Sequence, residues 1–172
     1  NGDYNQAISQ YNRVARIFPE IWKSKELFVL SGIYVEQGRY KDIIELLTTR
    51  LSYLKESDLN TQAELLNNWA FLSYLLGDYN NANTKVDQVL SNSVSLHNQL
   101  IGYFVKGFIL AENNNISELS NIMQVAQDSI NKHPDESFYN LLNSAIKINY
   151  YIAKEEFNSA LTEFDNMDAK GD

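Results

Sequence analysis

The sequence has no cysteine, few helix-breaking residues and no long apolar run. Because none of the 172 residues is cysteine, disulfides, thiol catalysis and thiolate metal sites are excluded. Only 2 prolines and 7 glycines are present, which predicts long helices joined by short connections. Charged or amide residues interrupt every hydrophobic segment before it reaches membrane-spanning length, so we expect no membrane insertion.

Basic residues are scarce in the C-terminal two thirds of the chain. The formal net charge of −8 divides into +2 over residues 1–55 and −10 over residues 56–172. A surface with this excess of carboxylates repels phosphate backbones, so a nucleic-acid partner is disfavoured. The excess is typical of a solvated face and is also compatible with a basic partner.

The residues that catalysis or metal binding would need are also missing. Neither of the 2 histidines has a second ligand at helical spacing, since Pro134 separates His133 from Glu136 and nothing suitable follows His97. Adjacent carboxylates such as those at 155–156 point apart on a helix, which rules out a general acid–base pair. No glycine-rich phosphate loop or nucleophile elbow is present. The sequence therefore predicts a non-enzymatic protein without catalytic, cofactor-binding or metal-binding residues.

The remaining composition is that of a folded protein. Hydrophobic residues make up 44% and charged residues 21% of the chain, and its length suits one domain with a substantial core. The absence of cysteine favours the cytosol and is compatible with other compartments.

A short motif recurs along the chain at intervals of about one helical hairpin. In its clearest copies, Gly-Asp-Tyr is followed by alanine three residues after the tyrosine, at Gly2 and again at Gly77. Five copies share an aromatic or aliphatic anchor, and these anchors are Tyr4, Tyr40, Tyr79, Ile116 and Phe157. They stand 36, 39, 37 and 41 residues apart, which indicates an internal repeat.

Each repeat is predicted to be two helices joined by a tight turn. Positions 3, 7 and 10 after each anchor form one apolar helical face, and the exception, Arg50, has an aliphatic stem that can cover apolar surface. The expected upstream helices are Lys25 to Gln37, Gln62 to Leu76, His97 to Glu112 and Glu136 to Lys154.

The turn between the two helices favours a residue that tolerates positive φ. Glycine supplies this in the clear copies, and Asn114 or Asn115 is expected to do so in the fourth. The residues expected to cap the second helices are Asp3, Asp78 and Asn115.

These motifs resemble the tetratricopeptide repeat. Gly-Asp-Tyr-x-x-Ala resembles the second half of that repeat, with the downstream residues Tyr11, Val14 and Pro19. The first half of the repeat is resembled by a set of residues upstream of Gly38, namely Leu27, Leu30, Ser31 and Tyr34. The resemblance implies an all-α fold, a right-handed α-solenoid of antiparallel helix–turn–helix repeats over residues 1–172. An ordinary helical bundle is the alternative, although five anchors in phase argue against it.

The resemblance also implies how the chain is divided. Residues 1–19 would be the second helix of a partial repeat, followed by repeats at 22–55 and 60–93 and degenerate repeats at 96–132 and 135–170. An array needs covered ends. Because this one begins with a lone second helix, we expect a segment of a larger protein or a homodimer through the uncapped ends.

In this family the first helices of the repeats line a concave groove that binds proteins or peptides. The resemblance places nine residues of this chain on that groove: Lys25, Phe28, Asn67, Asn68, Phe71, Tyr74, Phe104, Phe108 and Asn149. Asparagine amides both donate and accept, so they suit a peptide backbone, and aromatic residues suit side-chain anchors. Core packing against neighbouring helices is the alternative role for each aromatic residue.

The expected partner is apolar or basic. Family members that bind acidic chaperone tails use clustered cations on the concave face, whereas Phe28 and Gly32 stand at such positions here. The sequence therefore favours a protein-interaction scaffold. The alternative is a domain that senses a ligand or peptide within a larger protein, since the irregular repeats also resemble sensor arrays of bacterial transcriptional and signalling regulators.

Overall fold

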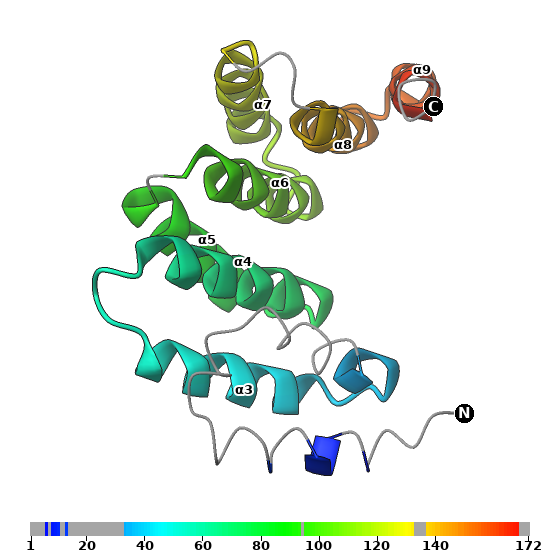
Figure 1. Cartoon of the computed structure of the whole chain (residues 1–172). Helices are drawn as coiled ribbons and strands as arrows, with labels where there is room; N and C mark the ends of the chain where they lie inside the picture. The colour runs from blue at the N-terminus through cyan, green and yellow to red at the C-terminus, as the bar shows by residue number, and fades with distance from the viewer. Residues whose placement is uncertain are drawn as a thin grey trace. The chain divides into compact units, whose positions relative to one another are not determined.

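The computed structural model describes residues 6, 8–10, 13, 33–93, 95–132 and 137–168. This part of the chain is helical and contains no strand, which confirms the prediction of an all-α protein (Figure 1). The labelled helices are α3 (Tyr40–Tyr53), α4 (Leu59–Leu75), α5 (Tyr79–Asn92), α6 (Leu96–Glu112), α7 (Ile116–Ile130), α8 (Ser137–Ala153) and α9 (Phe157–Asp168).

The chain divides into two compact units, residues 1–58 and residues 59–172. In the first unit α3 buries one side, on which Ile43 is 1% and Arg50 is 4% exposed. Arg50 thus occupies a buried position of the apolar face, as its long aliphatic stem allows. Before α3, Arg39 pairs with Asp42 at 2.6 Å, and its guanidinium lies 4.7 Å from the centroid of the Tyr34 ring.

In the second unit, α4 to α9 pack as three consecutive helical hairpins, α4 with α5, α6 with α7 and α8 with α9 (Figure 1). The first helices of the hairpins are also neighbours, because α6 contacts both α4 and α8. In addition α6 contacts α5, and α8 contacts α7. Each later hairpin therefore places its first helix against both helices of the hairpin before it.

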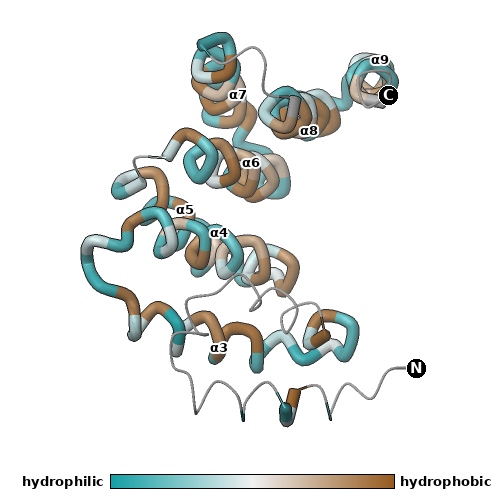
Figure 2. Tube along the Cα trace, viewed as in Figure 1, coloured by the Kyte–Doolittle hydropathy of each residue, from teal (hydrophilic) through white to brown (hydrophobic). Residues whose placement is uncertain are grey.

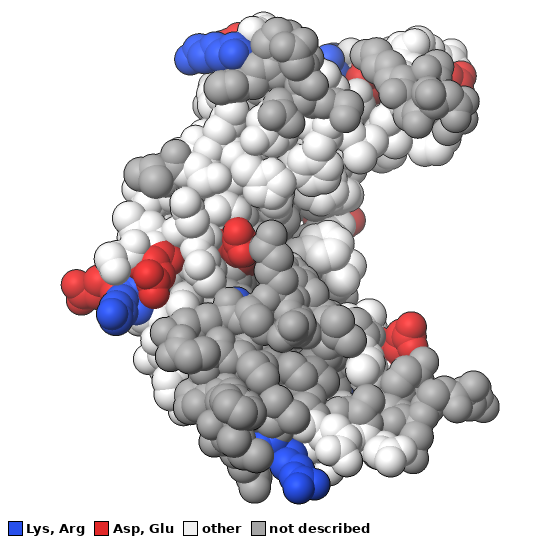
Figure 3. All heavy atoms as spheres, in the orientation of Figure 1, with Lys and Arg blue, Asp and Glu red and all other residues white. Residues whose placement is uncertain are grey.

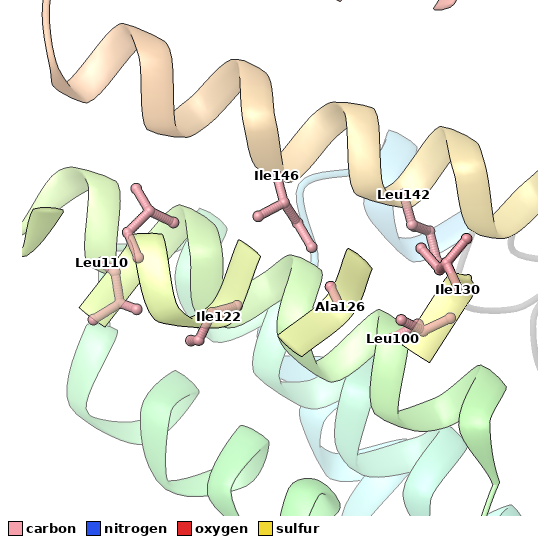
Figure 4. Packing of buried hydrophobic residues seen from close by; sticks show 8 residues of the cluster. Leu100, Leu110, Ile122, Ala126, Ile130, Leu142 and Ile146 are labelled. Carbon is pink, nitrogen blue, oxygen red and sulfur yellow. The ribbon is translucent and has the colours of Figure 1, made fainter. Parts of the chain in front are cut away.

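The core of this unit lies where α6, α7 and α8 meet (Figure 4). Leu100 on α6, Leu119 on α7 and Ile146 on α8 are each fully buried. Along these helices hydrophobic residues alternate with hydrophilic ones, so each helix has an apolar side (Figure 2). Burial of one such side chain contributes about 1.5–3 kcal/mol to folding, so this cluster, to which two successive hairpins contribute, stabilises the unit.

Four turns in the chain share one backbone geometry. The residues at positive φ are Gly38 (66°), Gly77 (76°), Asn114 (53°) and Glu155 (59°). In every case the following residue donates its N–H five residues back, at 2.8–2.9 Å, as in Asp78 to Ser73 and Glu156 to Tyr151. This is the Schellman motif, which ends a helix and reverses the chain. Positive φ was predicted at the glycines and at Asn114 or Asn115, of which Asn114 adopts it, but it was not predicted at Glu155.

Side chains then start the next helix. The Asp78 carboxylate accepts from the backbone N–H of Asn81 at 3.1 Å, and the Asn115 side-chain oxygen accepts from that of Glu118 at 3.3 Å. Both N-caps were predicted from the sequence. The third predicted cap, Asp3, lies outside the described residues.

Candidate functional site

Four of the predicted groove residues form a continuous aromatic row on α4 and α6: Phe71, Tyr74, Phe104 and Phe108. Ring centroids are 6.4 Å apart for Phe71–Tyr74, 5.4 Å for Tyr74–Phe108 and 4.7 Å for Phe104–Phe108. The spacing of three residues on α4 and four on α6 puts each pair on one helical face. Contact between α4 and α6 then joins the two pairs.

The aromatic row is part core and part surface. Phe104 packs against the core where α6, α7 and α8 meet, and against a second cluster of buried residues on α4, α5 and α6: Ala70, Ala82, Val86, Val105 and Ile109. Phe71, in contrast, is 37% exposed. Tyr74 and Phe108 are half-buried. Rings held by neighbouring rings lose little side-chain entropy on binding, so such a row suits a contact surface as well as helix packing.

Tyr74, inside the row between Phe71 and Phe108, gives it a polar group. Its hydroxyl donates to Glu112 Oε1 at 3.4 Å, and its ring lies 5.8 Å from that of Tyr79. Burial, and then the negative charge of Glu112, raise the pKa of Tyr74 above its ordinary value. The tyrosine therefore stays a neutral donor, and the Glu112 carboxylate places a negative charge beside the row.

The predicted asparagines behave differently from the aromatic residues. Asn67 is only 4% exposed, and its Nδ2 donates to the carbonyl of Asn98 at 3.0 Å. The Asn67 side chain therefore links α4 to α6, whereas the sequence predicted that its amide would be accessible to a partner. Asn68 is half-buried and donates to the Glu64 carbonyl of its own helix at 2.9 Å. Asn149 is half-buried on α8.

Two predicted groove residues, Lys25 and Phe28, lie outside the described residues. The described members of the predicted site are therefore on α4, α6 and α8 of the second unit.

A polar pocket that sequence reasoning missed lies beside α5 and α6. It has a volume of about 500 Å³, and Lys106, Asn83 and Glu118 are among its lining residues. Lys106 is 8% exposed; its Nζ donates to Asn83 Oδ1 and pairs with Asp87 Oδ1 at 2.9 Å. The available signal was a lone cation inside the otherwise apolar segment 100–111.

Metal-binding clusters and membrane-spanning helices are both absent from the described part of the chain. There, no group of three or more histidine and carboxylate side chains is arranged to hold a metal ion. None of the described helices has the length and apolarity to cross a bilayer. Comparison with family models, with curated proteins and with solved structures gave no match. The function must therefore be argued from the residues themselves.

Proposed function

We propose that this chain is an array of tetratricopeptide-like repeats, an α-solenoid that binds a partner protein or peptide at the aromatic row. The observation that carries the proposal is the joining of Phe71 and Tyr74 with Phe104 and Phe108 across two neighbouring first helices. A row shared by two repeats presents several rings to one extended or helical segment.

The turn geometry supports the repeat part of the proposal. The residues at positive φ, at positions 38, 77, 114 and 155, stand 39, 37 and 41 residues apart. The same Schellman turn at near-constant intervals is what a chain of similar hairpins requires. The packing of each first helix against both helices of the preceding hairpin supports stacking in one direction.

Charge near the row supports an apolar or basic partner. The only charged residue of α4 is Glu64, and Glu112 accepts the hydrogen bond from Tyr74. The single cation of α6 apart from its histidine, Lys106, already pairs with Asp87. A carboxylate-rich ligand would find few cations there, whereas a lysine or arginine would find Glu112.

Affinity capture with matched variants tests the proposal. The bait is the full chain, and the test variant carries Phe71→Ala with Phe108→Ala. Val125→Ala is the control, because Val125 on α7 is 37% exposed, the same fraction as Phe71. Circular dichroism and thermal melting check that each variant is folded. A partner bound by the parent and by the control is expected to lose at least about tenfold in affinity with the double variant.

Two outcomes would contradict the proposal. If a folded double variant holds the partner as tightly as the parent does, the aromatic row is only a packing feature. If a carboxylate-rich peptide binds at about micromolar strength, the charge argument is wrong.

The pocket at Lys106 favours sensing of a small polar ligand as a second candidate function. An ammonium group has three donors, and Asn83 and Asp87 accept two of them, so one N–H is left for a ligand acceptor. Screening small carboxylates by thermal shift against the parent and Lys106→Met tests this function. A stabilising ligand that acts equally on both proteins would contradict it.

A further inference from the structure

The outer side of α9 is an exposed apolar stripe, here called the terminal face, formed by Phe157, Leu161 and Phe164. These side chains are 59%, 62% and 54% exposed. Their spacing of four and three residues puts them on one helical face. Ala160 lies between them in sequence and is buried, at 7% exposure. So α9 packs on α8 with Ala160 buried, and it leaves the large side chains of Phe157, Leu161 and Phe164 mostly in solvent.

The same helical face is covered in an earlier repeat of this chain. Counted from the repeat anchor, the positions of Phe164 and Asp165 correspond to Val86 and Asp87 on α5. Val86 is fully buried, and α6 is the neighbouring first helix that packs on α5. The α6 residue Lys106 pairs with Asp87 at 2.9 Å, so an apolar helix that carries a cation covers this face.

A second hairpin contact follows the same rule. On α7, the side-chain oxygen of Gln127 accepts from Asn143 Nδ2 of α8 at 2.6 Å. In both repeats the second helix thus receives the next first helix through apolar contacts and one polar side chain donating to it. Gln127 stands one helical turn further along its helix than Asp87 does, and on α9 the position of Asp87 is taken by the exposed carboxylate of Asp165.

Among the described residues, the charge around the terminal face is mainly negative. The α9 sequence contains no lysine or arginine, and the preceding turn adds Glu155 and Glu156. The cation of that turn, Lys154, pairs with Glu156 at 2.5 Å. In the view of Figure 3, acidic atoms (red) are visible at the margin of the α9 region. Two copies of α9 would bring like charges together, which disfavours self-association.

We propose that the terminal face binds an amphipathic α-helix of a partner protein, with an apolar stripe flanked by lysine or arginine. The stripe covers Phe157, Leu161 and Phe164, and one cation pairs with Asp165 as Lys106 pairs with Asp87 within the chain. This inference rests on the repeat correspondence of the proposed function, but its surface is separate from the aromatic row, so binding at either surface can fail without the other failing.

Two synthetic helical peptides of about five turns test the proposal. Both have leucine at positions i, i+3, i+4 and i+7, but one has lysine and the other glutamate on the flanks. Binding of each labelled peptide to the full chain is measured by fluorescence anisotropy at about 50 mM and about 500 mM salt. The lysine peptide is expected to bind about tenfold or more tightly than the glutamate peptide at low salt, and this ratio is expected to shrink at high salt.

Variants assign the binding to the terminal face. The double variant Leu161→Ala with Phe164→Ala is expected to bind the lysine peptide at least about tenfold more weakly than the parent does. Asp165→Lys is an exposed change that does not remove apolar contacts, and it is expected to lower the preference for lysine flanks. Val125→Ala on α7, where Val125 is 37% exposed, is the control and is expected to leave the binding of this peptide unchanged.

Four results would overturn the proposal. The first is equal affinity of the two peptides for the chain. The second is that neither peptide binds with a dissociation constant below about 1 mM. The third is loss of binding with Phe71→Ala while the terminal-face variant still binds. The fourth is concentration-dependent dimerisation in sedimentation that Leu161→Ala with Phe164→Ala abolishes, because a second copy would then be the occupant.

Discussion

Glu155 holds a backbone conformation that glycine holds in two earlier turns. Its φ of 59° lies in the left-handed region, as do Gly38 at 66° and Gly77 at 76°. The turn is nonetheless formed with good hydrogen bonds, since the N–H of Glu155 donates to Ile152 at 2.9 Å and that of Glu156 to Tyr151 at 2.8 Å. We therefore expect Glu155→Gly to stabilise the protein by relieving backbone strain.

The size of the effect follows from two opposing terms. A non-glycine residue in the left-handed region costs about 1–2 kcal/mol. A new glycine offsets about 0.4–1 kcal/mol of the stability gained by removing this strain, because it makes the unfolded chain more flexible and so more favourable. The Glu155 side chain is exposed, so little packing is lost. The net gain expected is about 0.5–1 kcal/mol, which corresponds to a few degrees in melting temperature for a chain of this size.

Urea denaturation followed by circular dichroism measures this gain, with two controls. Glu155→Ala removes the carboxylate but keeps the backbone penalty, so the free energy of unfolding should change little. Gly77→Ala should lose about 1 kcal/mol, and this loss is purely conformational because no atom lies within 4 Å of the added Cβ. The reasoning is refuted if Glu155→Gly is no more stable than Glu155→Ala.

Three further changes test the packing and the electrostatics. Ile146→Ala should cost about 2–5 kcal/mol in urea denaturation, and Ile146→Val only about 0.5–1.5 kcal/mol, because Ile146 is fully buried; similar losses from both would contradict the core assignment. Gly107→Ala should raise the free energy of unfolding by about 0.5–1 kcal/mol, since the added Cβ would meet nothing nearer than 3.6 Å. Gly102→Ala should raise it less, or lower it, because the added Cβ would lie 3.1 Å from Leu90 Cδ2. Because the pKa of Tyr74 is raised in the folded state, the unfolded chain loses that proton first. The free energy of unfolding should thus fall as the pH rises above about 10, and it should fall less steeply for Tyr74→Phe than for the parent. Equal slopes for the two proteins would contradict the raised pKa.

Local chemistry allowed the turns and the helix starts to be predicted before the fold was known. A glycine or asparagine just before a capping residue marks a helix end and a chain reversal within a few residues. That is why Gly77, Asp78, Asn114 and Asn115 were placed correctly. Glu155 escaped prediction because nothing in a glutamate favours positive φ, so the surrounding helices must impose it.

The sequence by itself determined the helices, the interval between the turns and the apolar face of each helix, because these depend on residues close together in the chain. Only the tertiary structure decided which side chains meet across helices. Asn67 is buried against Asn98, 31 residues away, and Lys106 pairs with Asp87. Periodicity shows that a residue faces a neighbouring helix, but the neighbour's register decides whether that residue is buried, paired or exposed.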